Sequence, residues 1–599
     1  GYTITRDLKF TTLFNAQLEN ETNKQFSPSS LTSGGTGDAT GSNTFDKTVS
    51  WEVQGYFNYN KRLGGNHQVS GTAGLSADKW RDDYYTVAMN RYVTETYNTT
   101  GAGNIDLTKT RTTAAARTDA SFFARLGYNY GSKYILQGTY RRDGSSRFGM
   151  RNKFGNFFSG SAAWRFTEEK FMDWTRSVLH DGKFRFSTGK TGNDAIGNYA
   201  SYTVMTFGQY YNGVIGAGIN STLGNDLIQW ETTYTTNYGL DLTFLKGRLT
   251  FSADYYTKIT KDLLYRDELA KETGGSNVTV NIGSIRNRGL EFTLQGTPIA
   301  AKNLNWDISG NVSFQRSRIE ELANHASFIA GNKWLIREGG RLGDFYLWKN
   351  LGVYQYDASN AYATDGRKLD ARNVSADGKT ADYYLEGKPY AGTIKRISRN
   401  GIILQGGDTE WLDSDNNGII DENDKVNYGN GLPDFFFGIT NTVRYKNFSL
   451  NFLFNGQFGN RIYNLVANQQ NENRSTYTPP IWDAVLTSWK KQGDISVYPY
   501  FNRRDDRGSI STGYNSLYIE DGSFIRLSSV RLNYNLDQRI AKAVRMKNAS
   551  VYVYGNNLLM WTNYSWYDPE FSSKGLTIGE DNGKYPKRRE VGVGVNVNF

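Results

Sequence analysis

The sequence predicts an all-β protein: a transmembrane antiparallel β-barrel with long extracellular loops. Three observations support this fold class. Apolar and polar residues alternate with a period of two in many segments, short and long links alternate between those segments, and the composition is rich in aromatic residues and glycine. The 599 residues include 13 Trp, 41 Tyr, 33 Phe and 64 Gly, with only 9 Pro and no Cys. Disulfide frameworks and thiolate metal sites are therefore excluded.

Hydropathy and charge exclude three further classes of protein. Mean hydropathy is −0.60, and no apolar run approaches the ~18 residues that a membrane-spanning helix requires. The hydrophobic content of 38% is too high for a disordered chain. The net charge of +10 is spread along the chain without a long run of Lys or Arg. We therefore expect no nucleic-acid binding.

The strand periodicity is clearest in three segments. In each segment apolar side chains occupy every second position and mostly polar ones lie between them, so the two sets face opposite sides of a sheet. The apolar sets are Val49, Trp51, Val53, Gly55, Phe57 and Tyr59; Leu249, Phe251, Ala253 and Tyr255; and Phe448, Leu450, Phe452, Phe454, Gly456 and Phe458. The pattern predicts about 16 to 18 strands of roughly ten residues, the length that crosses a bilayer when tilted. Short helices are predicted only at 168–174 and 481–491.

The links between strands fall into two length classes. Short turns are predicted at 64–66, 246–248 and 446–447, and long links at 82–118, 355–433 and 460–523. Outer-membrane barrels have short periplasmic turns and long extracellular loops. We therefore expect 355–433 and 460–523 to be extracellular loops, the apolar strand faces to meet outer-membrane lipid, and the polar faces to line a lumen.

The C-terminus follows the same alternation. Val591, Val593, Val595, Val597 and Phe599 alternate with polar residues and glycine, so the chain ends on an aromatic residue in the middle of a strand pattern. Such an ending resembles the terminal strand that outer-membrane proteins present to their assembly machinery.

Eight segments together resemble a known family. In chain order they are 140–148, 154–166, 184–193, 287–294, 412–425, 431–439, 524–532 and 552–558. They are similar to the barrel of the SusC/RagA family of TonB-dependent outer-membrane transporters. Members of that family carry a signal segment, a plug and a barrel of about 22 strands. The resemblance therefore implies that residues 1–599 are the C-terminal barrel portion, without the plug and the signal segment.

The resemblance also implies a function. It suggests active import of an oligosaccharide or peptide across the bacterial outer membrane, driven by the TonB complex through the plug. A SusD-like surface lipoprotein would act as a lid, and barrel–lid pairs would form a dimer. Two alternatives stay open on the residues alone. Strand counting permits a complete passive porin, whereas a soluble glycan-binding β-propeller requires repeats of about 40 to 50 residues that the sequence does not show.

One loop motif predicts a cation site. Residues 413–424 place oxygen-bearing side chains at positions 1, 3, 5, 9 and 12 of a twelve-residue frame, with Gly418 at position 6. This is the layout of a calcium loop. We expect Ca²⁺, or another hard cation, to be bound by Asp413, Asp415, Asn417, Asp424 and the Ile419 carbonyl. Asp at position 12 is shorter than the usual Glu, which predicts modest affinity. The alternative is an acidic loop of Asx turns without an ion.

No catalytic site is predicted. The three histidines, His67, His180 and His325, are far apart and lack metalloprotease spacing, and no G-x-S-x-G nucleophile motif is present. The sequence therefore predicts a protein that is not an enzyme and that has no cofactor apart from the calcium.

Overall fold

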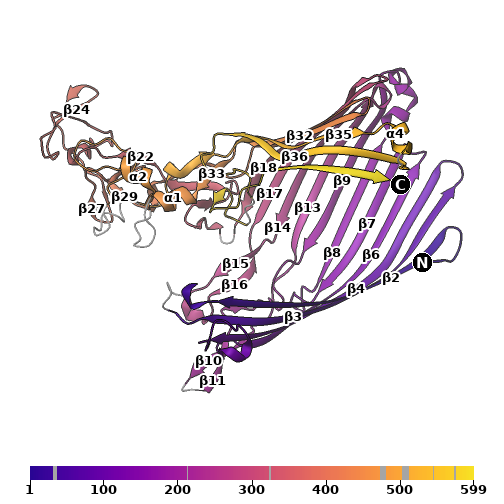
Figure 1. Cartoon of the computed structure of the whole chain (residues 1–599), viewed down its shortest axis with the longest axis horizontal. Helices are drawn as coiled ribbons and strands as arrows, with labels where there is room; N and C mark the ends of the chain where they lie inside the picture. The colour runs from indigo at the N-terminus through magenta and orange to yellow at the C-terminus, as the bar shows by residue number, and fades with distance from the viewer. Residues whose placement is uncertain are drawn as a thin grey trace. The chain divides into compact units, whose positions relative to one another are not determined.

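The computed structural model describes residues 1–31, 37–211, 214–322, 325–472, 481–501, 512–543, 545–571 and 575–598. The chain divides into two compact units, which are described separately. Unit 1 comprises Gly1–Lys246 and Asp254–Arg286, and unit 2 comprises Gly247–Ala253 and Asn287–Phe599. Strands dominate both units (Figure 1). Among the described residues, no helix has the length and apolarity needed to cross a membrane.

Unit 1 is built on one antiparallel ladder. Each strand pairs with the next in the order β1, β2, β3, β4, β6, β7, β8, β9 and β13, and β5 pairs with the end of β4. The strands are β1 (Tyr2–Thr3), β2 (Leu8–Ser27), β3 (Thr40–Leu63), β4 (His67–Asn90), β5 (Asn104–Ile105), β6 (Arg111–Tyr130), β7 (Tyr134–Ser145), β8 (Phe154–Trp164), β9 (Leu179–Asn193) and β13 (Glu231–Phe244).

Tight turns join neighbouring strands at one end of this ladder. Leu63 pairs with His67 across the predicted turn at 64–66, and Tyr130 pairs with Tyr134 across 131–133. Gly64 has a φ of +52°, a left-handed conformation that costs glycine little. We call this the short-turn end of the ladder and the opposite end the long-loop end.

The predicted alternation gives unit 1 an apolar face and a polar face. On β3, the side chains of Val49, Trp51, Val53 and Phe57 are 37–48% exposed. Val53 pairs with Ala77 and Ala77 pairs with Ala120, so the apolar positions of neighbouring strands share one side of the sheet. We call this side the apolar face.

The strands are longer than the sequence predicted. Sixteen described strands have nine residues or more, which agrees with the expected number, but β2, β3, β4 and β6 run for 20 to 24 residues. Much of the predicted long link at 82–118 is therefore strand: Asp82 pairs with Ala115 and Thr86 with Arg111. In this stretch polar side chains occupy both faces, so the sequence shows no apolar alternation.

The remaining elements of unit 1 are small. β10 and β11 form a hairpin, and β12, β15 and β16 form a three-stranded sheet. The predicted helix at 168–174 is present as 3₁₀ turns. The bounds are β10 (Met205–Tyr211), β11 (Val214–Ile219), β12 (Thr222–Leu223), β15 (Leu264–Glu268), β16 (Asn277–Asn281), η1 (Ser29–Leu31), η3 (Thr100–Ala102), η4 (Phe166–Glu168), η5 (Lys170–Thr175), η6 (Leu245–Gly247) and η7 (Lys271–Thr273). β14 (Leu249–Lys261) and β17 (Ser284–Ala300) contribute residues to both units.

Unit 2 has its own antiparallel ladder, in the order β18, β31, β32, β35, β36 and β38. The predicted two-residue turn at 446–447 joins β31 to β32. Valines 591, 593 and 595 on β38 are 62–76% exposed, as the terminal alternation predicted, whereas Phe599 lies outside the described residues. The strands are β18 (Leu304–Glu321), β31 (Phe435–Tyr445), β32 (Phe448–Phe458), β35 (Phe524–Asn535), β36 (Asn548–Thr562) and β38 (Glu590–Asn598).

A folded insertion separates β18 from β31. We call its described residues, 325–434, the loop domain; the insertion starts earlier in the chain than the predicted loop at 355–433. A core inside it contains Tyr354, Tyr362, Ile397, Leu404, Trp411 and Ile420. Its strands are β19 (Phe328–Ala330), β20 (Trp334–Ile336), β21 (Asp344–Trp348), β22 (Asn350–Val353), β23 (Asp370–Arg372), β24 (Asp382–Leu385), β25 (Lys388–Pro389), β26 (Ser398–Arg399), β27 (Ile402–Ile403), β28 (Thr409–Trp411), β29 (Ile419–Ile420) and β30 (Lys425–Asn430), with η9 (Asp357–Ser359) and η10 (Glu422–Asp424).

The segment between β32 and β35 covers the second predicted loop, 460–523. Tyr463 and Tyr518 of this segment share a second core with Trp334, Phe345 and Leu347 of the loop domain. The predicted helix at 481–491 is present as the shorter α2. The remaining elements of unit 2 are β33 (Arg461–Asn464), β34 (Ile519–Asp521), β37 (Glu580–Asp581), α1 (Leu465–Glu472), α2 (Trp482–Thr487), α4 (Gln538–Ala543) and η11 (Ser516–Tyr518).

Candidate functional site

The loop with calcium-loop spacing lies inside the loop domain, between β28 and β30. Ile420, at position 8 of its frame, is 2% exposed and packs into the core that contains Tyr354 and Trp411. Ile419 and Ile420 form β29, which pairs in parallel with β26. The core therefore anchors the middle of the loop and leaves its first half near the surface.

Three of the five predicted ligands come together. Asp413, Asp415 and Asp424 each offer a carboxylate oxygen, and these oxygens lie within 4.8 Å of one another. Asp424 is fully buried, Asp413 is half-buried and Asp415 is exposed. Among the described residues, this is the only group of three or more side chains from His, Cys, Asp and Glu that could hold a metal ion.

The other two predicted ligands belong to Asn417 and Ile419. In this structure both residues are engaged in hydrogen bonding or strand pairing within the loop domain. The Asn417 amide oxygen accepts a hydrogen bond from the Ile419 N–H at 2.6 Å, and its amide nitrogen donates to Asp415 at 2.8 Å. Ile419 is held in β29 by the register pair with Ser398. The geometry thus brings the three carboxylates together, while Asn417 donates to one of them and uses its amide oxygen within the loop.

The structure adds a role for Asp424 that the calcium spacing did not predict. One Asp424 oxygen accepts from the Ser414 N–H at 2.7 Å, and the other accepts from the Asp421 N–H at 2.8 Å. Asp421 in turn caps η10 by accepting from the Asn423 N–H at 2.7 Å. The Asp421-x-x-Asp424 spacing resembles a capping box and could have indicated this arrangement. Each carboxylate oxygen retains lone-pair capacity for a cation.

The charge balance of the loop favours a cation. Burial raises the pKa of Asp413 above its ordinary value, and the neighbouring Asp415 and Asp424 raise it further, whereas the Gly418 N–H and the Lys395 ammonium lower it. Lys395 donates to the Asn416 carbonyl beside the carboxylates. A divalent cation between the carboxylates would relieve their mutual repulsion.

Gly418 is required by the backbone at position 6. Its φ is +88°, and a Cβ at this position would lie 2.6 Å from the Lys395 Cε. Glycine therefore permits both the sharp turn and the close approach of the lysine.

The polar face of the unit 1 ladder carries half-buried charge pairs. Arg185 donates to both carboxylate oxygens of Asp241 at 2.8 and 2.9 Å, and to both oxygens of Asp254 at 3.0 and 2.9 Å. Bidentate pairs of this kind are strong and geometrically specific. The polar face is thus charged and hydrogen-bonded, which suits the wall of a hydrated lumen.

The three histidines lie in separate surroundings. The His325 ring nitrogen lies 2.8 Å from Glu338, which raises the pKa of the imidazole, and the His67 ring nitrogen lies 2.7 Å from the Tyr128 hydroxyl. His180 is in β9. None of the three belongs to the carboxylate cluster.

A family comparison decides the class of protein. The sequence model described as "TonB dependent receptor-like, beta-barrel" matches residues 1–385, more than half of the chain. The chain belongs to this family. It is therefore an all-β outer-membrane barrel protein, and the apolar face of its ladders contacts lipid.

Individual relatives support the resemblance to SusC and RagA within this TonB-dependent family. TonB-dependent receptor P39 of Formosa agariphila is 36% identical over 599 residues, covering 99% of this chain and 57% of that protein. The SusC receptor of Bacteroides thetaiotaomicron is 28% identical over 503 residues, covering 81% of this chain and 44% of that protein. The fold is similar to a chain of the RagAB peptide transporter, with a TM-score of 0.79, 20% identity, and coverage of 100% of this chain and 60% of that chain.

The chain spans about half the length of the curated relatives that it matches.

Proposed function

We propose that this chain is the barrel part of an active outer-membrane importer of the SusC type, which takes up an oligosaccharide or peptide. Membership of the TonB-dependent receptor-like family carries this proposal. Energy from the TonB complex would act through a plug, and a SusD-like surface lipoprotein would act as the lid. We also propose that two barrel–lid pairs form a dimer. The same proposal includes the absence of enzymatic activity.

One feature of the structure supports an importer over a passive pore. The loop domain and the segment between β32 and β35 share a core built around Trp334, Phe345 and Tyr463, so the long loops are folded bodies. Folded loops can present a fixed surface to a lid or a substrate. Porins of 16 to 18 strands instead hold an open aqueous channel. Family membership leaves no support for the soluble β-propeller alternative.

Uptake in cells tests the importer. The gene for the full-length protein is deleted in its native host, and growth is measured on a pool of oligosaccharides and on a pool of peptides. We expect loss of growth on one pool, the same loss in a strain lacking TonB, and recovery of a surface lipoprotein with the tagged protein. Uptake that persists without TonB, together with an open conductance in planar bilayers, would establish the porin alternative instead.

We also propose that the loop at 413–424 binds Ca²⁺ or a similar hard cation to stabilise the loop domain. Convergence of Asp413, Asp415 and Asp424 within 4.8 Å carries this proposal. Asn417 and the Ile419 carbonyl would complete the site once the loop adjusts around the ion.

Calorimetry on the purified full-length protein tests the cation site. We expect binding at or below millimolar calcium, lost in Asp413→Asn and retained in Glu386→Gln. Glu386 is an exposed acidic residue of the same loop domain that pairs with the exposed Arg367 at 2.7 Å and lies outside the carboxylate cluster. Absence of heat at millimolar calcium, or equal binding by both variants, would refute the site.

A further inference from the structure

Basic side chains gather at one edge of the lipid-facing side of unit 1. We consider the apolar-face positions of β3, β4, β6, β7 and β8, all of which are described. Apart from His67, these positions are neutral except for six residues, which are Lys47, Lys61, Lys79, Arg81, Asp83 and Arg142. Lys61 lies beside the turn at 64–66, whereas the other five lie toward the long-loop end. Neutral residues fill the band between the two ends.

The charges at the long-loop end do not cancel. Arg81 binds Asp83 through three hydrogen bonds of 2.8 to 3.1 Å, so this pair is neutral. Lys47 is the register partner of Asp83. Lys79 and Arg142 are exposed, and neither forms an ion pair with another described residue. The edge therefore presents a net positive charge to the membrane.

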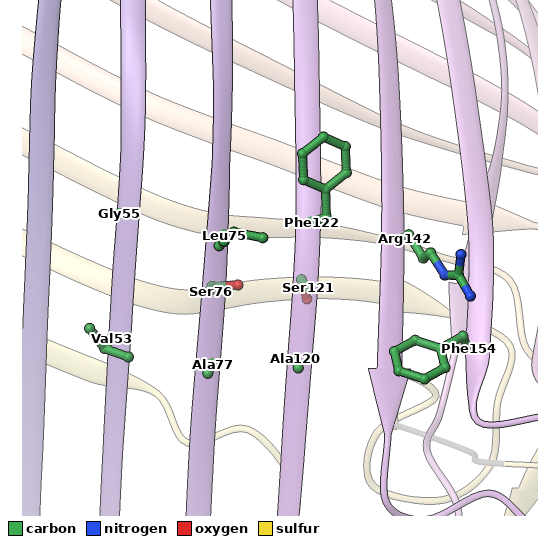
Figure 2. A pocket seen from close by; sticks show the side chains of 10 residues that line it. All are labelled: Val53, Gly55, Leu75, Ser76, Ala77, Ala120, Ser121, Phe122, Arg142 and Phe154. Carbon is green, nitrogen blue, oxygen red and sulfur yellow. The ribbon is translucent and has the colours of Figure 1, made fainter. Parts of the chain in front are cut away.

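A hollow of about 490 Å³ opens on the same face, with Arg142 at its rim. Figure 2 shows Val53, Leu75, Phe122 and Phe154 around it, contributed by β3, β4, β6 and β8. Leu75 pairs with Phe122 and Phe122 with Arg142, so the three share one row across the sheet. The hollow is apolar along this row until it reaches the guanidinium.

The Arg142 guanidinium lies against one aromatic neighbour. It lies 5.0 Å from the centroid of the Phe154 ring, in a cation–π contact. The Phe154 ring can lie across β7 because Gly144 has no side chain: a Cβ there would meet the ring at 2.4 Å. The ring thus holds the guanidinium at the rim of the hollow, and its N–H groups have no described acidic partner.

Two other hollows on this face differ in whether a cation lies at their edge. One of about 730 Å³ between β2 and β3 is lined by Leu18, Val49 and Trp51 and has Lys47 at its edge. Another of about 530 Å³ lies near the short-turn end, beside Val69 and Leu136, and none of its lining residues is charged. Of these three hollows, the two toward the long-loop end have a cation at their edge.

We propose that Arg142 binds the phosphate of a phosphorylated lipid in the outer leaflet, with an acyl chain of that lipid in the hollow, and that Lys79 and Lys47 add positive charge along the same edge. The long-loop end of an outer-membrane barrel faces the cell exterior, which places these cations at the headgroups of the outer leaflet. Basic residues at membrane depth attract anionic headgroups, and guanidinium matches phosphate geometry. A soluble anion would need the cations alone, whereas the apolar hollow beside them fits an amphipathic ligand.

Lipid retention by the full-length protein tests this proposal. The protein is reconstituted in phosphatidylcholine nanodiscs containing phosphorylated lipid A, extracted in mild detergent, and the retained lipid is measured by native mass spectrometry. We expect retention to weaken about fivefold for each cation removed, in Arg142→Gln and in Lys79→Gln. Arg142→Lys should retain most of the lipid, which shows that charge at this position is what matters.

Two control variants locate the site. Arg141→Gln changes the neighbouring arginine on the opposite face, where it pairs with Asp143 at 2.6 Å, and Lys61→Gln removes a cation from the same face at the short-turn end. Both should retain lipid A like the unmodified protein. A heat-modifiable band on gels confirms that each variant is folded.

Three outcomes would overturn the proposal. Retention of lipid A by the Arg142→Gln, Lys79→Gln double variant at the unmodified level would show that these cations do not bind it. Equal retention of dephosphorylated lipid A would show that the hollow binds acyl chains alone. Displacement of the lipid by inorganic phosphate at millimolar concentration would show that the cations form a site for a free anion.

Discussion

Replacing Asp424 by alanine tests whether its carboxylate holds the 413–424 loop together. The residue is fully buried, and its two oxygens accept the backbone N–H groups of Ser414 and Asp421 at 2.7 and 2.8 Å. Ser414 and Asp421 are exposed, so water can reach their N–H groups when the acceptor is lost; each lost hydrogen bond then costs about 0.5–1.5 kcal/mol, or about 1–3 kcal/mol for the two. We expect this loss without any calcium, because both hydrogen bonds belong to the protein itself. The loss should grow when calcium is added, because only the unmodified loop gains an ion.

Hydrogen exchange measures this loss locally, without unfolding the barrel. Amide exchange in residues 413–425 is compared between Asp424→Ala and the unmodified protein, in chelator and in calcium. A loss of about 1–3 kcal/mol accelerates exchange by roughly 5- to 150-fold. Glu386→Gln, which alters an exposed carboxylate elsewhere in the loop domain, serves as the control and should leave exchange in residues 413–425 unchanged. Unchanged protection in Asp424→Ala under chelator would refute the bridging role, and equal protection with and without calcium in the unmodified protein would count against the ion.

Three further substitutions probe the same unit. Gly418→Ala forces a side chain into a φ of +88° and against Lys395, so we expect a loss of about 1 kcal/mol and weaker calcium binding by calorimetry. Ile420→Ala opens a cavity in the core of the loop domain and should cost about 2–5 kcal/mol, measured as faster proteolysis between β18 and β31. Lys333→Ala removes a buried ammonium 2.9 Å from Glu580, and we expect a loss of about 3–5 kcal/mol in local exchange, partly recovered by adding Glu580→Gln. No recovery would mean that the lysine acts through the Tyr514 ring, whose centroid lies 3.7 Å from the ammonium.

The sequence predicted strands well wherever one face is apolar. The alternation at 49–59 and 448–458 marks β3 and β32 because lipid-facing positions must be apolar while the opposite face is not so constrained. The same reasoning underestimated β4 and β6 beyond Asp82 and before Thr118. There both faces carry polar side chains, and backbone pairing alone continues the ladder.

The candidate site was predicted in part for a similar reason. Spacing along the chain brought Asp413, Asp415 and Asp424 into one group, since a twelve-residue loop that reverses direction places its alternate positions inside. The engagement of Asn417 with its own backbone depends on local turn geometry, which spacing does not determine. The sequence pattern does not indicate a site at Arg142, because this arginine is a single residue within a strand. Only the strand register shows which apolar residues lie beside it.

The loop domain interrupts the unit 2 ladder in sequence, between two strands that pair with each other. β18 and β31 are hydrogen-bonded neighbours, with Phe314 beside Phe435. In the sequence, however, the whole loop domain is inserted between these two strands. Chain-closure entropy grows only slowly with loop length, and an insert with its own core holds its ends in place as a folded body. The insert meets the ladder at its two points of attachment and along the end of β18, where Ile319 exchanges backbone hydrogen bonds with Gly339 and Gly340. Such a joint allows the rest of the inserted module to diverge, or to be exchanged for another fold with similarly spaced ends, while the strands of the ladder keep their register.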